Sequence, residues 1–154
     1  MILVDTNLLL YAAIEGAPEH SRAQRWLDGQ LSNGMRVGLP WHSLLGFVRL
    51  ASNRSVYRDG PGVASAWQIV RDWLGAPTVW IPQPTEHHAD VLDSLFAATG
   101  IGSRSVMDAH LAALAIEHGL TLCSNDNGFA QFKKLRWVNP LAEKSMTRFP
   151  KRAT

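Results

Sequence analysis

A helix followed at once by a buried strand, in residues 105–124, is the feature that most constrains the fold of this 154-residue chain. Residues 105–118 place apolar side chains at helical spacing and include several alanines, which favour a helix that packs closely against a sheet. Gly119 is expected to end this helix, because glycine enters the left-handed conformation most easily. Residues 120–124, which alternate apolar and small polar side chains before Cys123 and Ser124, then predict a short buried strand, and residues 125–128 predict a turn after it. A helix, a tight stop and an apolar strand make up half of a parallel α/β unit.

The N-terminal residues supply the other half of this unit. Residues 1–4 are uniformly apolar, as expected of a strand buried on both faces, and residues 8–14 continue as a helix. Strands and helices alternate along the rest of the chain, which predicts an α/β fold with a central parallel sheet sandwiched by helices. Residues 1–142 are expected to form this single domain, and residues 143–154 a basic tail that frays. The remaining elements are expected as strands near residues 35–40, 78–82 and 135–138 and as helices near residues 18–31, 44–51, 63–74 and 86–99.

Composition limits where such a chain works and what it binds. Cys123 is the single cysteine, which excludes a disulfide within the chain and fits a reducing cytoplasm. No apolar run in the sequence approaches the length needed to span a bilayer, so we expect a cytoplasmic protein with no membrane contact. A net charge of +2 and a pI near 9.0 are compatible with a polyanionic partner, although many small proteins carry a similar charge.

Three aspartates stand at positions that a parallel sheet brings together. Asp5 and Asp126 follow predicted strands, and Asp108 lies at the start of the helix that precedes the second strand. Ligands of parallel sheets bind outside the carboxyl ends of the strands, so the three carboxylates are expected to converge on a Mg²⁺ or Mn²⁺ site. Each acid also has a structural alternative: Asp5 as a helix cap, Asp108 in a capping box with Ser105, and Asp126 in a turn. Their joint placement favours the metal site.

The histidines and basic residues give weaker signals. His87 and His88 point about 100° apart on a helix and make a poor zinc pair, and His110 and His118 lie too far apart on their helix to share an ion. All four are interpreted as solvated or core-edge histidines. A further set of cationic side chains either lines a groove for a nucleic-acid backbone or is ordinary surface: Arg49, Arg54, Arg58, Arg104, Lys133, Lys134 and Arg136.

Short motifs lie at residues 4–7, 107–115 and 123–126, and further ones at residues 39–41, 46–49, 128–132 and 135–137. In these motifs the sequence resembles the PIN-domain ribonucleases, and within them the VapC toxins of bacterial toxin–antitoxin systems. The resemblance implies an endoribonuclease that depends on Mg²⁺, for which Mn²⁺ can substitute, and that cuts structured RNA, usually tRNA or ribosomal RNA. It makes Asp5, Asp108 and Asp126 the metal-binding and catalytic acids. It also implies a cognate VapB-type antitoxin and a homodimer.

Two positions depart from the family pattern. The family usually has a further acid, often Glu, in the helix after the second strand, where this chain has Gly46. A second acid two residues after the last aspartate is also common, and here that residue is Gly128. Three carboxylates therefore remain, which predicts about one divalent ion per chain, bound weakly without RNA, and metal-assisted phosphodiester hydrolysis.

Alternatives to the nuclease differ in class. Gly46 supports a PIN-like protein that binds RNA or a partner without cutting it. A phosphotransfer enzyme with Asp5 as nucleophile would usually carry a second Asp where this chain has Asn7. Trp41, Phe47 and Leu50 are candidates for an apolar surface that docks the antitoxin, with core packing as the alternative for at least two of them.

Overall fold

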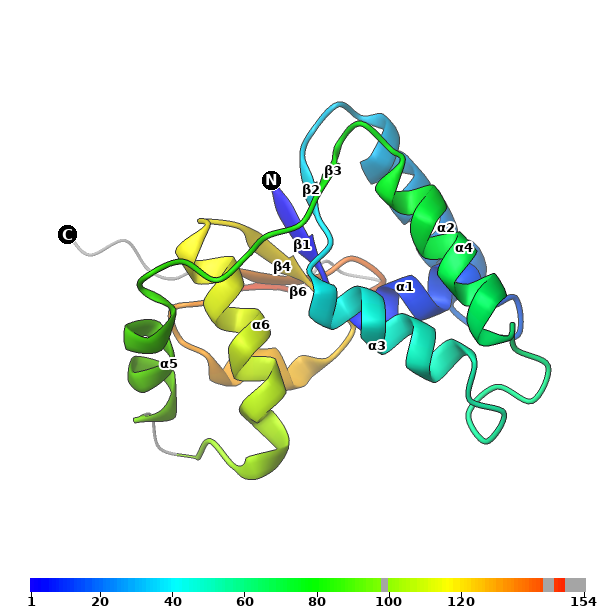
Figure 1. The fold of residues 1–154 in the computed structure, drawn as a ribbon. Coiled ribbons are helices and arrows are strands. Elements are labelled where there is room, and N and C mark those ends of the chain that lie inside the picture. Colours follow the sequence, from blue (N-terminus) through cyan, green and yellow to red (C-terminus); the bar gives the residue numbers. More distant parts are fainter. Residues whose placement is uncertain (98–99, 143–145, 149–154) are drawn as a thin grey trace.

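The structure, a computed structural model, describes residues 1–97 and 100–142 and the backbone of residues 146–148 (Figure 1). The described strands form one six-stranded sheet in the order β3-β2-β1-β4-β5-β6. Among the described residues, none of the helices is long and apolar enough to cross a membrane. In chain order the elements are β1 (Ile2–Val4), α1 (Thr6–Ala13), α2 (His20–Ser32), β2 (Val37–Gly38), α3 (Trp41–Ala51), α4 (Val63–Leu74), β3 (Val79–Trp80), α5 (His88–Phe96), η1 (Ser103–Ser105), α6 (Val106–Glu117), β4 (Thr121–Cys123), η2 (Asn127–Gln131), β5 (Trp137–Asn139) and β6 (Met146–Arg148).

The predicted α/β fold with a central parallel sheet is confirmed. Strands β1 to β5 are mutually parallel, and β6 alone runs antiparallel to its neighbour β5. From β1 the chain adds β2 and β3 on one side and later returns to place β4 and β5 on the other side. The order of the strands therefore reverses between β1 and β4, which is where open α/β sheets form their ligand crevice.

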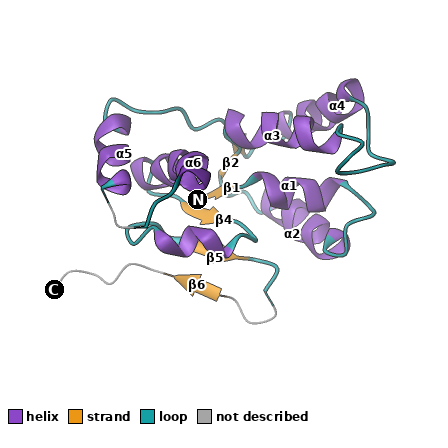
Figure 2. Ribbon diagram, turned by 90° about the horizontal axis from the view of Figure 1, so that it is seen from below, coloured by secondary structure: helices purple, strands orange, loops and turns teal. Residues whose placement is uncertain are grey.

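Two hydrophobic clusters cover the central strands, because alternate strand residues face opposite sides of the sheet. Val4 and Cys123 belong to the cluster formed with α1 to α4, whereas Leu3 and Leu122 belong to the cluster formed with α5, α6 and η2. All four side chains are almost completely buried. The two helical groups lie on opposite sides of the central strands in both views (Figures 1 and 2).

Several element boundaries differ from the prediction. Strand β2 is confined to Val37–Gly38, and prolines lie just beyond β2 and β3, where they cannot donate a hydrogen bond to the sheet. Helix α3 begins at Trp41, directly after Pro40 in an extended conformation, rather than at residue 44. The short helix η2 was not predicted, although it follows directly from a turn.

The expectation that the C-terminal tail frays is corrected for part of its length. Met146–Arg148 forms β6 and pairs with Trp137–Asn139 of β5. A sheet edge presents unpaired backbone groups, and the returning chain satisfies those of β5. The other residues of the predicted 143–154 tail lie outside the described residues.

Candidate active site at the carboxyl ends of β1 and β4

Asp5 lies directly after β1 and is nearly buried, with 9% of its surface exposed. Its Oδ1 accepts a hydrogen bond from the backbone N–H of Thr6 at 2.7 Å, so Asp5 caps α1. Its Oδ2 accepts a hydrogen bond from the hydroxyl of Ser124 at 2.6 Å. The capping role and a place in the site are therefore not alternatives, because the same carboxylate serves the helix and faces the end of β4.

Ser124 holds this region together and was missed as a site residue by the sequence analysis. It is completely buried, and its Oγ accepts hydrogen bonds from the Asn7 side-chain amide and the Asp126 backbone N–H, each at 3.0 Å. The register of β1 and β4 pairs Val4 with Cys123, so the next residues, Asp5 and Ser124, come side by side. A polar residue directly after a buried strand was the signal available in the sequence.

Burial and like charges perturb the carboxylates at this site. Burial raises the pKa of Asp5 to about 6, with the charges of Asp108 and Asp126 adding to the rise and hydrogen bonds from Ser124 and Thr6 opposing it. The pKa of Asp108 is also raised, by burial and then by Asp126, while His42 opposes the rise. The structure thus brings the three predicted acids within electrostatic reach of one another, although they lie 103 and 18 positions apart in sequence.

The structural alternatives for Asp108 and Asp126 turn out differently. Ser105 is the N-cap residue of α6 but makes no side-chain cap, and its Oγ instead accepts from the Gln131 amide at 3.2 Å, so the predicted capping box is wrong. Across the described part of the chain, Asp108 makes no hydrogen bond or ion pair. Asp126 does serve a turn, since its Oδ1 accepts from the Gly128 N–H at 2.7 Å.

Gly46 faces the first residue of α1, next to Asp5. A Cβ added at Gly46 would lie 2.8 Å from Oγ1 and 3.2 Å from Cγ2 of Thr6. Such distances are shorter than ordinary van der Waals contact, so an acidic side chain at this position requires Thr6 to move. The absence of a fourth acid is therefore built into the packing of α3 against α1.

An open groove lies beside the acids, between α3 and the start of α6. Burial and the charge of Arg49 lower the pKa of His42, while Asp108 opposes them. Trp41 is 39% exposed, and its ring stacks on that of Trp67 with centroids 6.5 Å apart. The groove therefore combines an aromatic face, a guanidinium and imidazoles. Its lining residues are Trp41, His42, Leu45, Gly46, Arg49, Met107 and His110.

Two of the other predicted cationic residues lie away from Arg49. Arg136 donates to the Gly119 carbonyl, before β4 and β5 begin and hence at the opposite edge of the sheet. Lys134 donates to the Ser94 hydroxyl of α5 at 3.2 Å. A single basic groove through all of the predicted residues is therefore wrong.

The structure also tests the predictions for the three apolar docking residues and for the histidines. Phe47 is fully buried against Trp73, with ring centroids 4.8 Å apart, and Leu50 packs against the same core cluster. Of the three proposed docking residues, Trp41 alone is exposed. His87 is solvated, and His88 and His110 are half-buried, as expected of solvated and core-edge histidines, but the hydrogen bond between His88 and His110 was not predicted.

The donor set suits a hard divalent cation. The site offers carboxylate oxygens, which Mg²⁺ and Mn²⁺ prefer, and the mutual repulsion of these carboxylates is what a cation would relieve. Within residues 1–97 and 100–142, no group of three or more His, Cys, Asp or Glu side chains is placed so that it could hold a metal ion. Mg²⁺ keeps several waters and uses one or two carboxylates in proteins, so it does not require three side-chain ligands.

Comparison with known proteins assigns the chain to a class. The PIN domain family matches residues 2–135, nearly the whole of the described domain, so the chain belongs to the PIN-domain family. Ribonuclease VapC37 of Mycobacterium tuberculosis (strain ATCC 25618 / H37Rv) is 44% identical over 143 residues, covering 92% of this chain and 99% of that protein. Within the PIN-domain family the chain is a VapC-type endoribonuclease.

Solved structures agree on the fold. The crystal structure of VapC20 from Mycobacterium tuberculosis, described as a Sarcin-Ricin loop cleaving toxin, matches with a TM-score of 0.63 at 20% identity, covering 84% of this chain and 93% of that chain. VapBC2 from Rickettsia felis, solved with a DNA fragment from its promoter, matches with a TM-score of 0.62 at 17% identity, covering 89% of this chain and 97% of that chain. Such likenesses concern the backbone arrangement alone.

Proposed function

We propose that this protein is the toxin of a toxin–antitoxin pair and cleaves structured RNA, either tRNA or ribosomal RNA, as a Mg²⁺-dependent endoribonuclease. Mn²⁺ is expected to substitute for Mg²⁺. The observation that carries the proposal is the electrostatic coupling of Asp5, Asp108 and Asp126 at the point where the strand order reverses. The charge of Asp126 raises the pKa of Asp108, and both charges raise that of Asp5, so the cluster is costly in an empty site. Perturbed carboxylates of this kind gather at functional sites.

Asp5, Asp108 and Asp126 are the residues that would hold the metal. A bound Mg²⁺ supplies an activated water and neutralises charge that develops on the phosphate during hydrolysis. The chain itself keeps the carboxylates in place: Ser124 and the Thr6 N–H fix both oxygens of Asp5. Asp126 is fixed by its own turn, whereas Asp108 projects from the first turn of α6 and is free to adjust to a substrate phosphate.

The proposed partner is a small VapB-type antitoxin that covers the site. The named relatives are VapC proteins, and one solved structure of the same fold is a VapBC pair. Around the groove Trp41, Leu45 and Met107 are exposed large apolar side chains, which a protein segment could cover. Mixing the protein with its cognate antitoxin should abolish cleavage.

A homodimer is the expected oligomeric state. The expectation rests on the likeness to the VapC family, and the test is sedimentation velocity ultracentrifugation. A single species of twice the chain mass, 17.0 kDa, at micromolar concentration is the expected result. A monomer across that concentration range would contradict it.

A second candidate function is a PIN-like protein that binds RNA without cutting it. The packing of Gly46 against Thr6 favours it, because no fourth carboxylate can enter without rearrangement. The two functions differ in one experiment. Purified protein is incubated with total RNA with added Mg²⁺, added Mn²⁺ or EDTA, beside the variant Asp5→Asn, and the 5′ ends produced are mapped. Metal-dependent cuts made by the wild type and missing with Asp5→Asn support the nuclease, whereas RNA binding without cuts supports the binder.

A further inference from the structure

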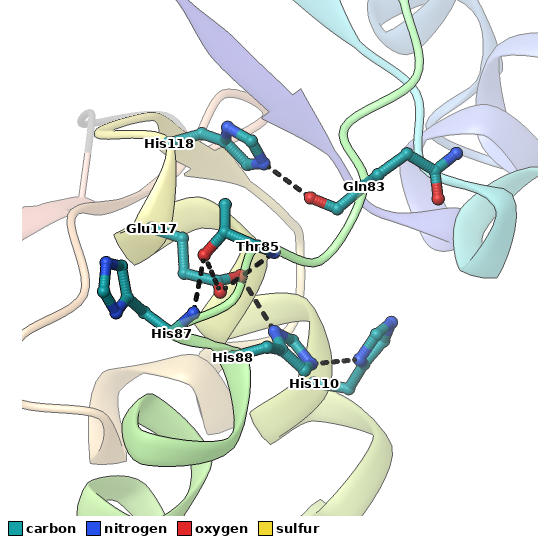
Figure 3. Close-up of polar contacts among 7 residues, drawn as sticks. All are labelled: Gln83, Thr85, His87, His88, His110, Glu117 and His118. Carbon is teal, nitrogen blue, oxygen red and sulfur yellow. Dashed lines mark hydrogen bonds and ion pairs between the residues drawn. The ribbon is translucent and has the colours of Figure 1, made fainter.

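A partly buried chain of hydrogen bonds links α5 to α6 beside the candidate site (Figure 3). Glu117, whose side chain is 1% exposed, accepts at Oε1 from the Thr85 hydroxyl at 2.8 Å. Its Oε2 lies 2.8 Å from Nδ1 of His88, and Nε2 of His88 lies 2.9 Å from Nδ1 of His110. Three titratable side chains thus follow one another in a line that ends at His110.

The hydrogen bonds along this line determine which ring nitrogen of His110 carries hydrogen. An ionised carboxylate can only accept, so Glu117 requires the Nδ1 of His88 to carry hydrogen. A neutral imidazole has one N–H, which leaves the Nε2 of His88 as an acceptor and makes the Nδ1 of His110 the donor to it. The Nε2 of neutral His110 is then left with an unshared lone pair. Glu117 fixes, through His88, which nitrogen of His110 is available.

His110 lines the groove, and its second ring nitrogen is directed away from His88 (Figure 3). Trp41 and Arg49 line the same groove, and His110 lies two residues after Asp108 on α6. His42 on the α3 side meets the His110 ring edge-on, with centroids 5.9 Å apart, which limits how far the ring can turn.

We propose that His110 contacts the RNA substrate, accepting at Nε2 a hydrogen bond from a nucleotide next to the cleaved phosphate, and that His88 and Glu117 are positioning residues for its ring. The inference rests on the proposed RNA cleavage. The donor is a ribose 2′-hydroxyl or a base N–H, since both offer a hydrogen to an imidazole nitrogen.

A nucleotide fits this groove better than a peptide does. The exposed face of Trp41 offers a stacking surface of the kind that holds unpaired bases. Arg49 supplies a guanidinium suited to a phosphate in the same groove. A hydrogen-bond acceptor, an aromatic ring and a cation in one groove match the donor, the base and the phosphate of a nucleotide.

The first test reads the ring nitrogens directly and does not require cleavage. Nitrogen-15 spectra of the imidazoles at pH 8 are expected to show the Nδ1–H form for both His88 and His110, although free neutral histidine favours Nε2–H. Adding a substrate-length RNA in EDTA should shift the His110 Nε2 signal and leave His87 unchanged. A His110 ring in the Nε2–H form, or one unaffected by bound RNA, would overturn the proposal.

The second test separates contact from structure by variants. His110→Asn keeps an atom close to the Nδ1 position that faces His88 but lacks the outer nitrogen. We expect kcat/KM for RNA to fall about tenfold with His110→Asn, the usual effect of one lost hydrogen bond. His87→Asn, at the exposed position directly before α5, is the control and should cleave as the wild type does.

Substrate substitutions then identify the donor. If a 2′-hydroxyl is the donor, one 2′-deoxy substitution near the cut slows the wild type about tenfold and does not slow His110→Asn any further. If a base N–H is the donor, base substitution gives that pattern instead. If His110→Asn cleaves and binds RNA as well as the wild type does, the role of His110 is refuted and the proposed RNA cleavage is not. A wild type that never cuts RNA refutes the proposed function, and the nitrogen-15 titration still decides on the contact. If RNA leaves the His110 signal unchanged while antitoxin shifts it, the groove is an antitoxin contact.

Discussion

Individual carboxylates in this site differ in how much of the fold depends on them. Asp5 caps α1 and accepts from Ser124, so its replacement disturbs structure as well as charge. Asp108 has no hydrogen bond or ion pair within the described residues, which makes it the cleaner position for testing chemistry. The two residues thus separate the role of the charge from the role of the cap.

Asp108→Asn is expected to lower RNA cleavage by at least about 100-fold, because loss of a metal ligand should exceed the 10- to 100-fold effects of outer-shell changes. Its free energy of unfolding without metal should stay the same or rise by less than about 1 kcal/mol, since one like charge is removed from a partly exposed site. Rates on a mapped substrate and urea unfolding measure the two effects. Asp93→Asn on the exposed face of α5 is the matched control. Wild-type cleavage by Asp108→Asn would remove Asp108 from the site.

The raised pKa of Asp5 makes the stability of the metal-free protein depend on pH. The folded state holds this proton up to about pH 6, whereas the unfolded chain releases it near 3.8. The contribution of Asp5 to stability is therefore greatest below pH 3.8, declines as pH rises to about 6 and is lost above it. Relative to Asp5→Asn, the wild type should lose on the order of 1–3 kcal/mol between pH 4 and pH 7. Urea unfolding of both proteins in EDTA measures the difference, and a difference of the opposite sign would contradict the assignment.

At the scale of elements, the contact of α3 with α1 sets how many acids the site can have. Gly46→Ala gains about 1 kcal/mol of helix propensity but forces a Cβ to 2.8 Å from Thr6 Oγ1, and overpacking of this kind costs about 1–3 kcal/mol. We expect Gly46→Ala to destabilise the wild type and to stabilise the Thr6→Ala background, as followed by urea unfolding. Gly29→Ala in α2, where nothing lies within 4 Å, should stabilise both. The same sign for Gly46→Ala in both backgrounds would show that Thr6 is not the obstacle.

The elements that the sequence predicts well are those that a short stretch of sequence marks as buried by its own pattern of apolar residues. The buried strand β1, the alanine-rich α6 and β4 follow from periodicity and from Gly119, which adopts a φ of +62°. The meeting of Asp5 with the end of β4 follows from parallel pairing, because the carboxyl ends of parallel strands share one edge.

The rest of the site depends on contacts that leave no local trace. The bond from His88 to His110 requires α5 to pack on α6 in one orientation, and adjacent histidines at positions 87 and 88 look alike in sequence. The close approach of Gly46 to Thr6 likewise depends on the angle at which α3 crosses α1, and the spacing of apolar residues in the sequence does not reveal that angle.

On the scale of the whole molecule, the site joins the two halves of the helical cover. Asp5 caps α1, in the helical group α1 to α4, whereas Asp108 and His110 lie on α6, in the group formed with α5. The two groups lie on opposite sides of the central strands (Figure 2). An RNA bound across the sheet edge would contact both groups. The modest net charge of +2, with its cationic residues dispersed, implies that the shape of the groove and the metal contribute to RNA binding alongside bulk charge.

The number of ions per chain follows from the whole arrangement and is the last prediction. Three carboxylates, one of them nearly buried and already holding two hydrogen bonds, are expected to bind about one Mn²⁺ per chain weakly without RNA. Calorimetric titration with Mn²⁺ measures the stoichiometry, with Asp108→Asn as the control that weakens it. The double variant Thr6→Ala with Gly46→Glu has room for a fourth acid and should bind Mn²⁺ more tightly than Thr6→Ala alone. Two tightly bound ions in the RNA-free wild type would contradict the one-ion site, because three shared carboxylates leave too little negative charge to hold both.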